Sequence, residues 1–220
     1  EATKRVLGED HPDTLISMNN LALTYRDQGR WKEAEELGIQ ALEARNRVLG
    51  EDHPDTLTSM NNLASTYRDQ DRWKEAEELG IQALEARKRV LGEDHPDTLT
   101  SMNNLASIYR DQDRWKEAEE LGIQALEARK RVLGEDHPDT LISMNNLAYT
   151  WEGQGRSGDA IELMRECIRL RQQRLGSDHP FTMGSLETLA TWEEEEWEDT
   201  EWDDSEDENV QGGDFAGDGY

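Results

Sequence analysis

The chain has few of the features that mark secreted proteins, membrane proteins or nucleotide-binding enzymes. Its single cysteine excludes an intramolecular disulfide framework and fits a reducing compartment. No apolar run approaches the roughly 18 residues of a membrane span, and no signal peptide is visible. A glycine-rich phosphate loop is also missing, because the repeated L-G-E-D turns fit helix ends. These absences predict a cytoplasmic protein without membrane contact.

Basic residues are scarce as well. The sequence contains 24 Lys and Arg but 50 Asp and Glu, which gives a formal net charge of −26. No Lys or Arg follows Arg174, and residues 193–220 carry 14 acids, which leaves −12 for the rest of the chain. Such a surface repels phosphate backbones, so no nucleic-acid partner is expected.

The chain does contain a repeat of 42 residues. The units span residues 5–46, 47–88, 89–130 and 131–172, and a half-unit follows at 173–192. A hydrophobic fraction of 34% and a mean hydropathy of −0.97 would favour disorder, but the apolar residues recur in phase. Residues 1–192 therefore form the predicted array, and because the chain opens inside a unit, we expect further sequence before Glu1.

Each unit predicts two helices with short connections. His11-Pro12-Asp13 is typical of a helix start, and helix A is expected to run to about Gln28, with Gly29 as its stop. Helix B is expected from about Trp31 to Leu49, where Gly50 ends it. Gly38 inside helix B predicts the close approach of a neighbouring helix. The predicted fold is an all-α solenoid of stacked helical hairpins.

One apolar stripe on each helix predicts the core. The stripe comprises Leu15, Met18, Leu21, Ala22 and Tyr25 on helix A, and Ala34, Leu37, Ala41, Leu42 and Val48 on helix B.

The positions of Leu21-Ala22, Tyr25, Ala34 and Ala41 resemble the signature of the tetratricopeptide repeat. The 42-residue period is similar to that of kinesin light chains, and more so to the near-identical arrays that end fungal receptor-like ATPases of the NB-ARC and NACHT type. This resemblance implies a right-handed superhelix that binds a peptide or protein partner in its concave groove.

Residues that could carry chemistry have simpler structural interpretations. His11, His53, His95, His137 and His179 all occupy the same position of the repeat, where they fit helix starts better than a metal or catalytic site. Cys167 replaces a small buried residue of helix B and predicts a packed thiol. Trp31, Trp73 and Trp115 open helix B and fit packing between helices, with ligand contact as the alternative. We expect no enzyme activity and no cofactor.

Differences among the copies indicate where a partner could bind. The first three copies differ at few positions, and two of these, Ile16 and Leu23, share one face of helix A with Asn19, Arg26 and Asp27. The resemblance places this face in the groove, although tolerance of change at solvent-facing positions would also explain the differences. The predicted groove residues are Ile16, Asn19, Leu23, Arg26, Asp27, Thr58, Asn61, Ser65, Arg68, Asp69, Thr100, Asn103, Ser107, Arg110, Asp111, Ile142, Asn145, Tyr149 and Glu152. The asparagines would bond a peptide backbone and the arginines acidic side chains.

The C-terminal tail, residues 193–220, is acidic and is predicted to be disordered when unbound. Trp197 and Trp202 lie among acids and resemble the tryptophan-acidic peptides that dock on kinesin light chains. One hypothesis is that the tail docks in the array's own groove; the alternative is a solubilising tail whose tryptophans are incidental.

Two functions from different classes remain open, and a third alternative is that an enzyme domain before Glu1 defines the biology. The array is interpreted first as the ligand-sensing region of a larger receptor-like ATPase, and otherwise as a cargo-adaptor scaffold similar to a kinesin light chain. Both follow from the resemblance. A phosphate loop before Glu1 would favour the receptor, and heptad repeats there would favour the scaffold. The sequence does not identify the partner.

Overall fold

The computed structural model describes residues 6–210, with side chains over residues 6–196. This part of the chain is helical and contains no strand. The helices are α2 (Pro12–Asp27), α3 (Trp31–Leu49), α4 (Pro54–Arg68), α5 (Trp73–Leu91), α6 (Pro96–Asp111), α7 (Trp115–Leu133), α8 (Pro138–Gly153), α9 (Ser157–Leu175) and α10 (Pro180–Val210). Helix A of each unit is α2, α4, α6, α8 or α10, and helix B is α3, α5, α7 or α9. The predicted all-α solenoid is confirmed.

Histidine begins every helix A. His11 Nδ1 accepts a hydrogen bond of 3.2 Å from the backbone N–H of Asp13, and His53, His95, His137 and His179 make the same bond one unit further on each time. The ring therefore satisfies one of the donors that a helix N-terminus leaves free, while proline fills the first turn. The structural interpretation of the histidines is confirmed.

In each complete unit, the turn between helix A and helix B contains one residue with a left-handed backbone conformation. Gly29 and Gly155 adopt φ of 71° and 73° there, while Asp71 and Asp113 adopt 59° and 58° at the same position. Glycine takes this conformation without steric cost, whereas aspartate tolerates it at some cost. The turn is thus kept in all four units although two of them lack the preferred residue.

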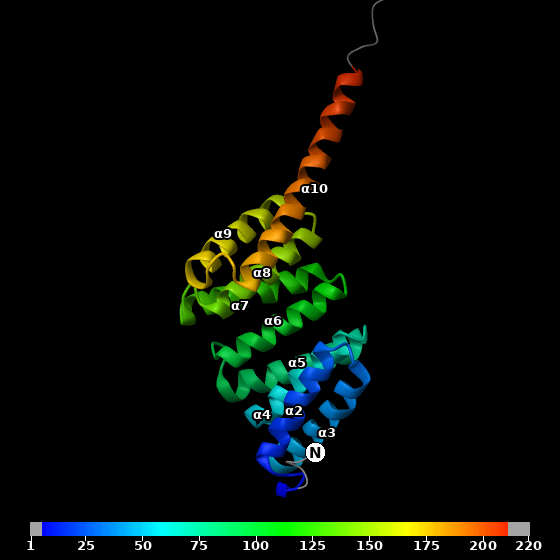
Figure 1. Ribbon diagram of the computed structural model, residues 1–220, viewed down its shortest axis with the longest axis vertical. Helices are drawn as coiled ribbons and strands as arrows, with labels where there is room; N and C mark the ends of the chain where they lie inside the picture. Colours follow the sequence, from blue (N-terminus) through cyan, green and yellow to red (C-terminus); the bar gives the residue numbers. More distant parts are fainter. Residues whose placement is uncertain (1–5, 211–220) are drawn as a thin grey trace, which may run out of the picture.

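The helices stack in chain order (Figure 1). Each helix contacts the next along the chain, and helix A also contacts the helix A of the following unit in the pairs α2–α4, α4–α6 and α6–α8. Comparable contacts between successive B helices are not found among the described elements. The A helices therefore line the inner side of the array, which is where the predicted groove was placed.

The core follows the predicted stripe, with two corrections. Leu15 and Ala41 are buried, but Leu21 is 41% exposed, because unit 1 has no helix B packed before it in the described residues; Leu63, at the same position in unit 2, is 4% exposed. Val48 is 44% exposed in the last turn of helix B, which at 19 residues outlasts the 16 residues of helix A.

Gly38 allows a close contact between units. A Cβ at Gly38 would lie 3.4 Å from Leu63 Cδ1, and the same contact recurs between Gly80 and Leu105. The predicted reason for a glycine inside helix B, the approach of the next helix A, is confirmed.

Helix α10 is longer than the expected capping helix. It was predicted to end near Trp192 but continues to Val210, and it extends beyond the stack as a single straight helix (Figure 1). Residues 193–210 contain no Pro or Gly, so nothing in this stretch interrupts the helix. Of the tail predicted to be disordered, residues 193–210 thus continue α10, and residues 211–220 lie outside the described residues.

Candidate functional site: the inner face of the A helices

Apart from the apolar side chains at its two ends, the polar positions of the predicted groove fall into two groups on the inner face. One group faces the next unit and is buried, and the other forms a row at the C-terminal ends of the A helices that remains partly exposed. The two groups have different consequences for ligand binding.

The asparagines belong to the buried group. Asn19, Asn61 and Asn103 are 8%, 4% and 5% exposed. Asn61 Nδ2 donates to Ser101 Oγ at 2.7 Å, and Asn103 Nδ2 donates to Ser143 Oγ at 2.7 Å, so each of these amides bonds the helix A of the next unit. The expectation of free amides for a peptide backbone is therefore corrected: these asparagines join units to each other.

An arginine of helix B, which is not among the predicted site residues, completes each junction. Arg87 is 3% exposed. Its Nη1 donates to the backbone oxygen of Asp97 and to Ser101 Oγ, both at 2.9 Å, and its Nη2 donates to Thr58 Oγ1 at 2.9 Å. Burial lowers the pKa of this guanidinium, although nearby Asp97 opposes the shift.

The same arginine recurs in every unit. Arg45, Arg129 and Arg171 bond the equivalent serine of the next unit. Arg171 keeps this role in unit 4, where many neighbouring positions have changed. The presence of arginine at this position in all four units was the signal in the sequence that could have indicated its structural role. Thr58 and Thr100, predicted as groove residues, accept from the buried arginines Arg87 and Arg129 and are therefore structural as well.

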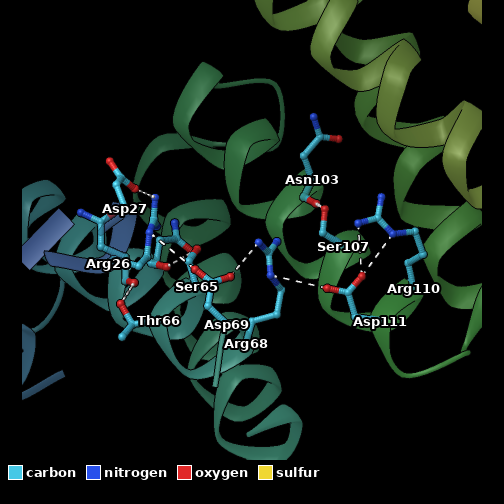
Figure 2. A network of polar contacts seen from close by, with 12 residues as sticks. Arg26, Asp27, Ser65, Thr66, Arg68, Asp69, Asn103, Ser107, Arg110 and Asp111 are labelled. Atoms are coloured by element: carbon cyan, nitrogen blue, oxygen red, sulfur yellow. Dashed lines mark hydrogen bonds and ion pairs between the residues drawn. The ribbon is translucent and has the colours of Figure 1, made fainter. Parts of the chain in front are cut away.

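The partly exposed group forms a row of alternating charges (Figure 2). Arg26 Nε lies 3.6 Å from Asp69 Oδ2 in the next unit, and Arg68 Nε lies 3.5 Å from Asp111 Oδ2. Each arginine also bonds the aspartate that follows it in sequence, as Arg68 does with Asp69 at 3.1 Å. The arginine side chains are 24–29% exposed, so solvent and a partner can reach them.

The row ends at Arg110. Unit 4 has Gly153 where the earlier units have aspartate, so the only carboxylate that bonds Arg110 among the described residues is Asp111; its guanidinium carbon lies 5.8 Å from the ring centre of Tyr149. Gly153 is required by packing, because a Cβ there would lie 2.3 Å from Trp115 Cζ3. Trp115 therefore contacts the next unit, as the packing interpretation expects, whereas Trp31 is 44% exposed at the same position of unit 1.

Unit 4 also adapts the inner face to α10. The Tyr149 hydroxyl lies 2.8 Å from Thr188 Oγ1, and its ring meets Trp192 edge-on at 5.1 Å between centroids. Glu152, at the arginine position, accepts from Ser157 Oγ at 3.1 Å. The altered stripe of unit 4 is thus explained in part by contacts with the last helix, as well as by any role in binding.

Apolar side chains are exposed at both ends of the inner face. Ile16 in unit 1 is 47% exposed, Ile142 and Tyr149 in unit 4 are 38% and 37% exposed, and Leu23 is partly exposed. Ser65 and Ser107, at the position of Leu23, donate to the backbone of their own helices. The available surface is therefore two apolar ends joined by the row of charges.

Other candidate chemistry is not supported within the described residues. No cluster of His, Cys, Asp and Glu could hold a metal ion there, and no described helix is long and apolar enough to cross a membrane. Cys167 is fully buried, its Sγ lies 3.3 Å from the Leu141 carbonyl oxygen, and burial raises the pKa of the thiol. The packed-thiol interpretation is confirmed.

The structure does not test docking of the tail. Trp197 and Trp202 belong to α10, whose C-terminal part leads away from the stack (Figure 1), and their side chains are outside the described part of the structure. Self-docking stays a prediction.

Comparison with known proteins agrees with this architecture. The model of the tetratricopeptide repeat matches residues 1–45, 18–89, 61–122 and 100–173. The chain belongs to the tetratricopeptide repeat family. Repeats of this family are typically non-catalytic scaffolds for protein interaction. No match was found among curated proteins.

Several solved tetratricopeptide structures are similar. Crystal structures of a Podosopora anserina protein with nearly identical repeats, provisionally named a kinesin light chain, share 30% identity over 87% of this chain and 90% of theirs, with a TM-score of 0.71. BtubC (BKLC) from P. vanneervenii shares 25% identity over 80% of this chain and 70% of its own, with a TM-score of 0.66. The apo form of RapI, at 17% identity and a TM-score of 0.64, shows the fold alone.

Proposed function

We propose that the inner face binds an extended segment of a partner protein across units 1 to 4. The observation that supports this proposal is the partly exposed row from Arg26 to Arg110, which is continuous over three units and has exposed apolar side chains beyond each end. A segment lying along the A helices would cover Ile16 and Leu23 at one end and Ile142 and Tyr149 at the other. Its carboxylates would compete with aspartate for the arginines.

This mode of binding uses many modest contacts. The arginines are already paired, so a partner carboxylate gains only the difference between two similar ion pairs. Most of the affinity must then come from burying the apolar ends, which a partner covers only if apolar residues occur at both ends of its segment. We therefore expect the partner to carry apolar residues separated by a polar stretch that includes acids.

The proposal is tested by selecting peptides from a displayed library on the full chain and measuring affinities by fluorescence anisotropy. Ile142→Ser is expected to weaken a selected peptide by about tenfold, and Arg68→Gln by a smaller factor. The control is Arg89→Gln, since this side chain is 63% exposed in the last turn of α5 and pairs with Asp52. Equal loss in all three variants, or none in Ile142→Ser, would contradict binding at the inner face.

The wider role that we propose is ligand sensing within a larger receptor-like ATPase. The near identity of the first three units supports this, because it resembles the arrays of fungal NB-ARC and NACHT proteins. Binding along the inner face would then alter the equilibrium of a nucleotide domain elsewhere in the protein. A phosphate-binding loop in the reading frame before Glu1 would support this role, and a coiled-coil heptad repeat there would oppose it.

A second candidate is a cargo adaptor. The similarity to the Podosopora anserina repeats named after kinesin light chains, and to BtubC (BKLC), favours it. The same upstream sequence separates the two candidates, because an adaptor needs a dimerising or motor-binding segment and no nucleotide site.

A further inference from the structure

Helix α10 presents an apolar stripe that no helix covers in the part of the chain that the structure describes. Met183 is 48% exposed and Leu186 is 37% exposed. At the same positions one unit earlier, Leu141 and Met144 are each 1% exposed. Ala190 continues the stripe and is also exposed. Residues at core positions of the repeat therefore face solvent on α10.

In the complete units this stripe is covered by a helix. Leu99 of α6 lies in one core cluster with Ala125 and Ala128 of α7, and Leu141 of α8 lies in another with Cys167 of α9. The opposite face of α10 is occupied, since Trp192 packs with residues of α8 and α9. Because α10 has the same packing stripe as α6 and α8, the element that fits it is a helix.

The charge of α10 restricts what this helix can be. Of the 18 residues from 193 to 210, 12 are Asp or Glu, and α10 contains no Lys or Arg. Acids three or four residues apart repel each other along a helix, and acids near its C-terminus oppose the helix dipole. A cationic neighbour would relieve both effects, whereas a second copy of α10 would increase the repulsion.

We propose that α10 is a docking site for a basic amphipathic helix of a partner protein. The apolar stripe of the partner helix covers Met183, Leu186 and Ala190, as helix B covers helix A in each complete unit. The Lys and Arg residues of the partner helix face the acids that follow Trp192, among which Glu194, Glu195 and Glu196 are exposed. This site is separate from the inner face and does not depend on the ligand proposed there.

The test uses the full chain and a defined peptide probe. The probe has the sequence of helix B from Trp115 to Leu133 with Glu117→Lys, Glu120→Lys and Glu127→Lys, which raises its formal charge from 0 to +6. The unsubstituted peptide, with the same apolar stripe, is the matched control. Binding is measured by fluorescence anisotropy at low and high salt, and self-association by sedimentation equilibrium.

Two sets of chain variants separate the apolar and electrostatic contributions. Met183→Ser with Leu186→Ser is expected to weaken the basic probe by at least about tenfold, and Glu194→Lys with Glu195→Lys by several-fold, because these side chains are exposed. Ile142→Ser, on the inner face, is expected to leave probe binding unchanged. Circular dichroism and thermal melting verify that each variant folds. The unsubstituted peptide should bind at least about tenfold more weakly than the basic probe.

Three results would overturn the proposal. The first is an absence of probe binding to the full chain. The second is equal affinity for the full chain and for the Met183→Ser, Leu186→Ser variant, which would show attraction by charge alone when Ile142→Ser also binds equally. The third is a dimer of the full chain that becomes a monomer in this variant, because a second copy would then be the occupant. Loss of binding in Ile142→Ser alone would instead place the probe on the inner face.

Discussion

Helices α6 and α10 occupy the same place in the repeat but have opposite surroundings. Leu99 of α6 is 1% exposed because α7 covers it, whereas Met183 of α10 is 48% exposed. Both helices begin with a histidine N-cap and bury a threonine and a serine against the preceding unit. The side of helix A that faces back along the array is therefore the same in both. What differs is the forward side, where burial depends on the neighbour that follows.

The largest effect is expected when Leu99 of α6 and Met183 of α10, which occupy the same position of the repeat, are each replaced by alanine. Leu99→Ala is expected to lower the free energy of unfolding by about 3 kcal/mol, because it leaves a cavity in a packed core. Met183→Ala should change it by less than about 0.5 kcal/mol, since its side chain is already in water. Urea unfolding followed by circular dichroism measures both. Similar losses in the two variants would mean that α10 is covered in solution.

The buried arginine provides the next largest contrast. Arg87→Ala is expected to cost about 2 kcal/mol, because Ser101, Thr58 and the Asp97 carbonyl lose a charged donor in a buried junction. Arg89→Ala, on the same helix but 63% exposed in its pair with Asp52, should cost less than about 0.5 kcal/mol. Chemical denaturation of the two variants compares them directly, and equal costs would show that the junction contributes no more than a surface pair.

Low pH should weaken the contact between units 3 and 4 that Glu119 makes with Trp151, Gln154 and Arg156. Burial acts to raise the pKa of Glu119, but hydrogen bonds from Gln154, Trp151 and Arg156 outweigh it, and the pKa is lowered from the ordinary 4.5. The stabilisation is therefore present above about pH 4.5 and is lost as the pH falls through the folded-state pKa.

Glu119→Gln tests the contribution of this carboxylate to the contact between units 3 and 4. The variant should lower the free energy of unfolding by less than about 1 kcal/mol at pH 7, because the side chain, 23% exposed, stays partly in contact with solvent that screens its pair with Arg156. The difference from the native chain should shrink at pH 3. Melting temperatures at both values of pH measure it, and a difference independent of pH would exclude the carboxylate as the cause.

The smallest effect concerns the left-handed turns. Asp71→Gly is expected to raise the free energy of unfolding by about 0.5 kcal/mol, because glycine accepts a φ of 59° without strain but has more freedom to lose. Gly29→Asp, at the same position of unit 1, should lower it by a similar amount. The pair is compared by urea unfolding, and the same sign in both variants would exclude backbone strain as the reason.

Local signals in the sequence were sufficient for the helices. Pro12 and Gly50 mark a start and a stop, and α3 spans Trp31–Leu49 as predicted. These signals act within a few residues of the boundary they set, so they can be read without knowing what lies nearby in space. The end of α10 was missed because the acidic composition that favours disorder contains no residue that forbids a helix.

The inner face was harder to predict because it depends on contacts between units. Asn61 shares a helix face with Arg68, yet the first is buried against Ser101 and the second is partly exposed. Periodicity along one helix cannot distinguish a face that meets solvent from a face that meets the next copy. Arg87 was missed for the same reason, since a charged residue in helix B is ordinarily assigned to the surface.

The junctions between units have a consequence for how such a chain can change in length. Asn61 bonds Ser101 and Asn103 bonds Ser143, each 40 residues further on, and Arg87 and Arg129 bond the serine 14 residues ahead. Insertion or deletion of one 42-residue block within the middle of the array therefore recreates the same junction on both sides. Recombination between the near-identical copies in the gene would yield longer or shorter arrays that fold by the same contacts, and selection could then act on the length of the inner face.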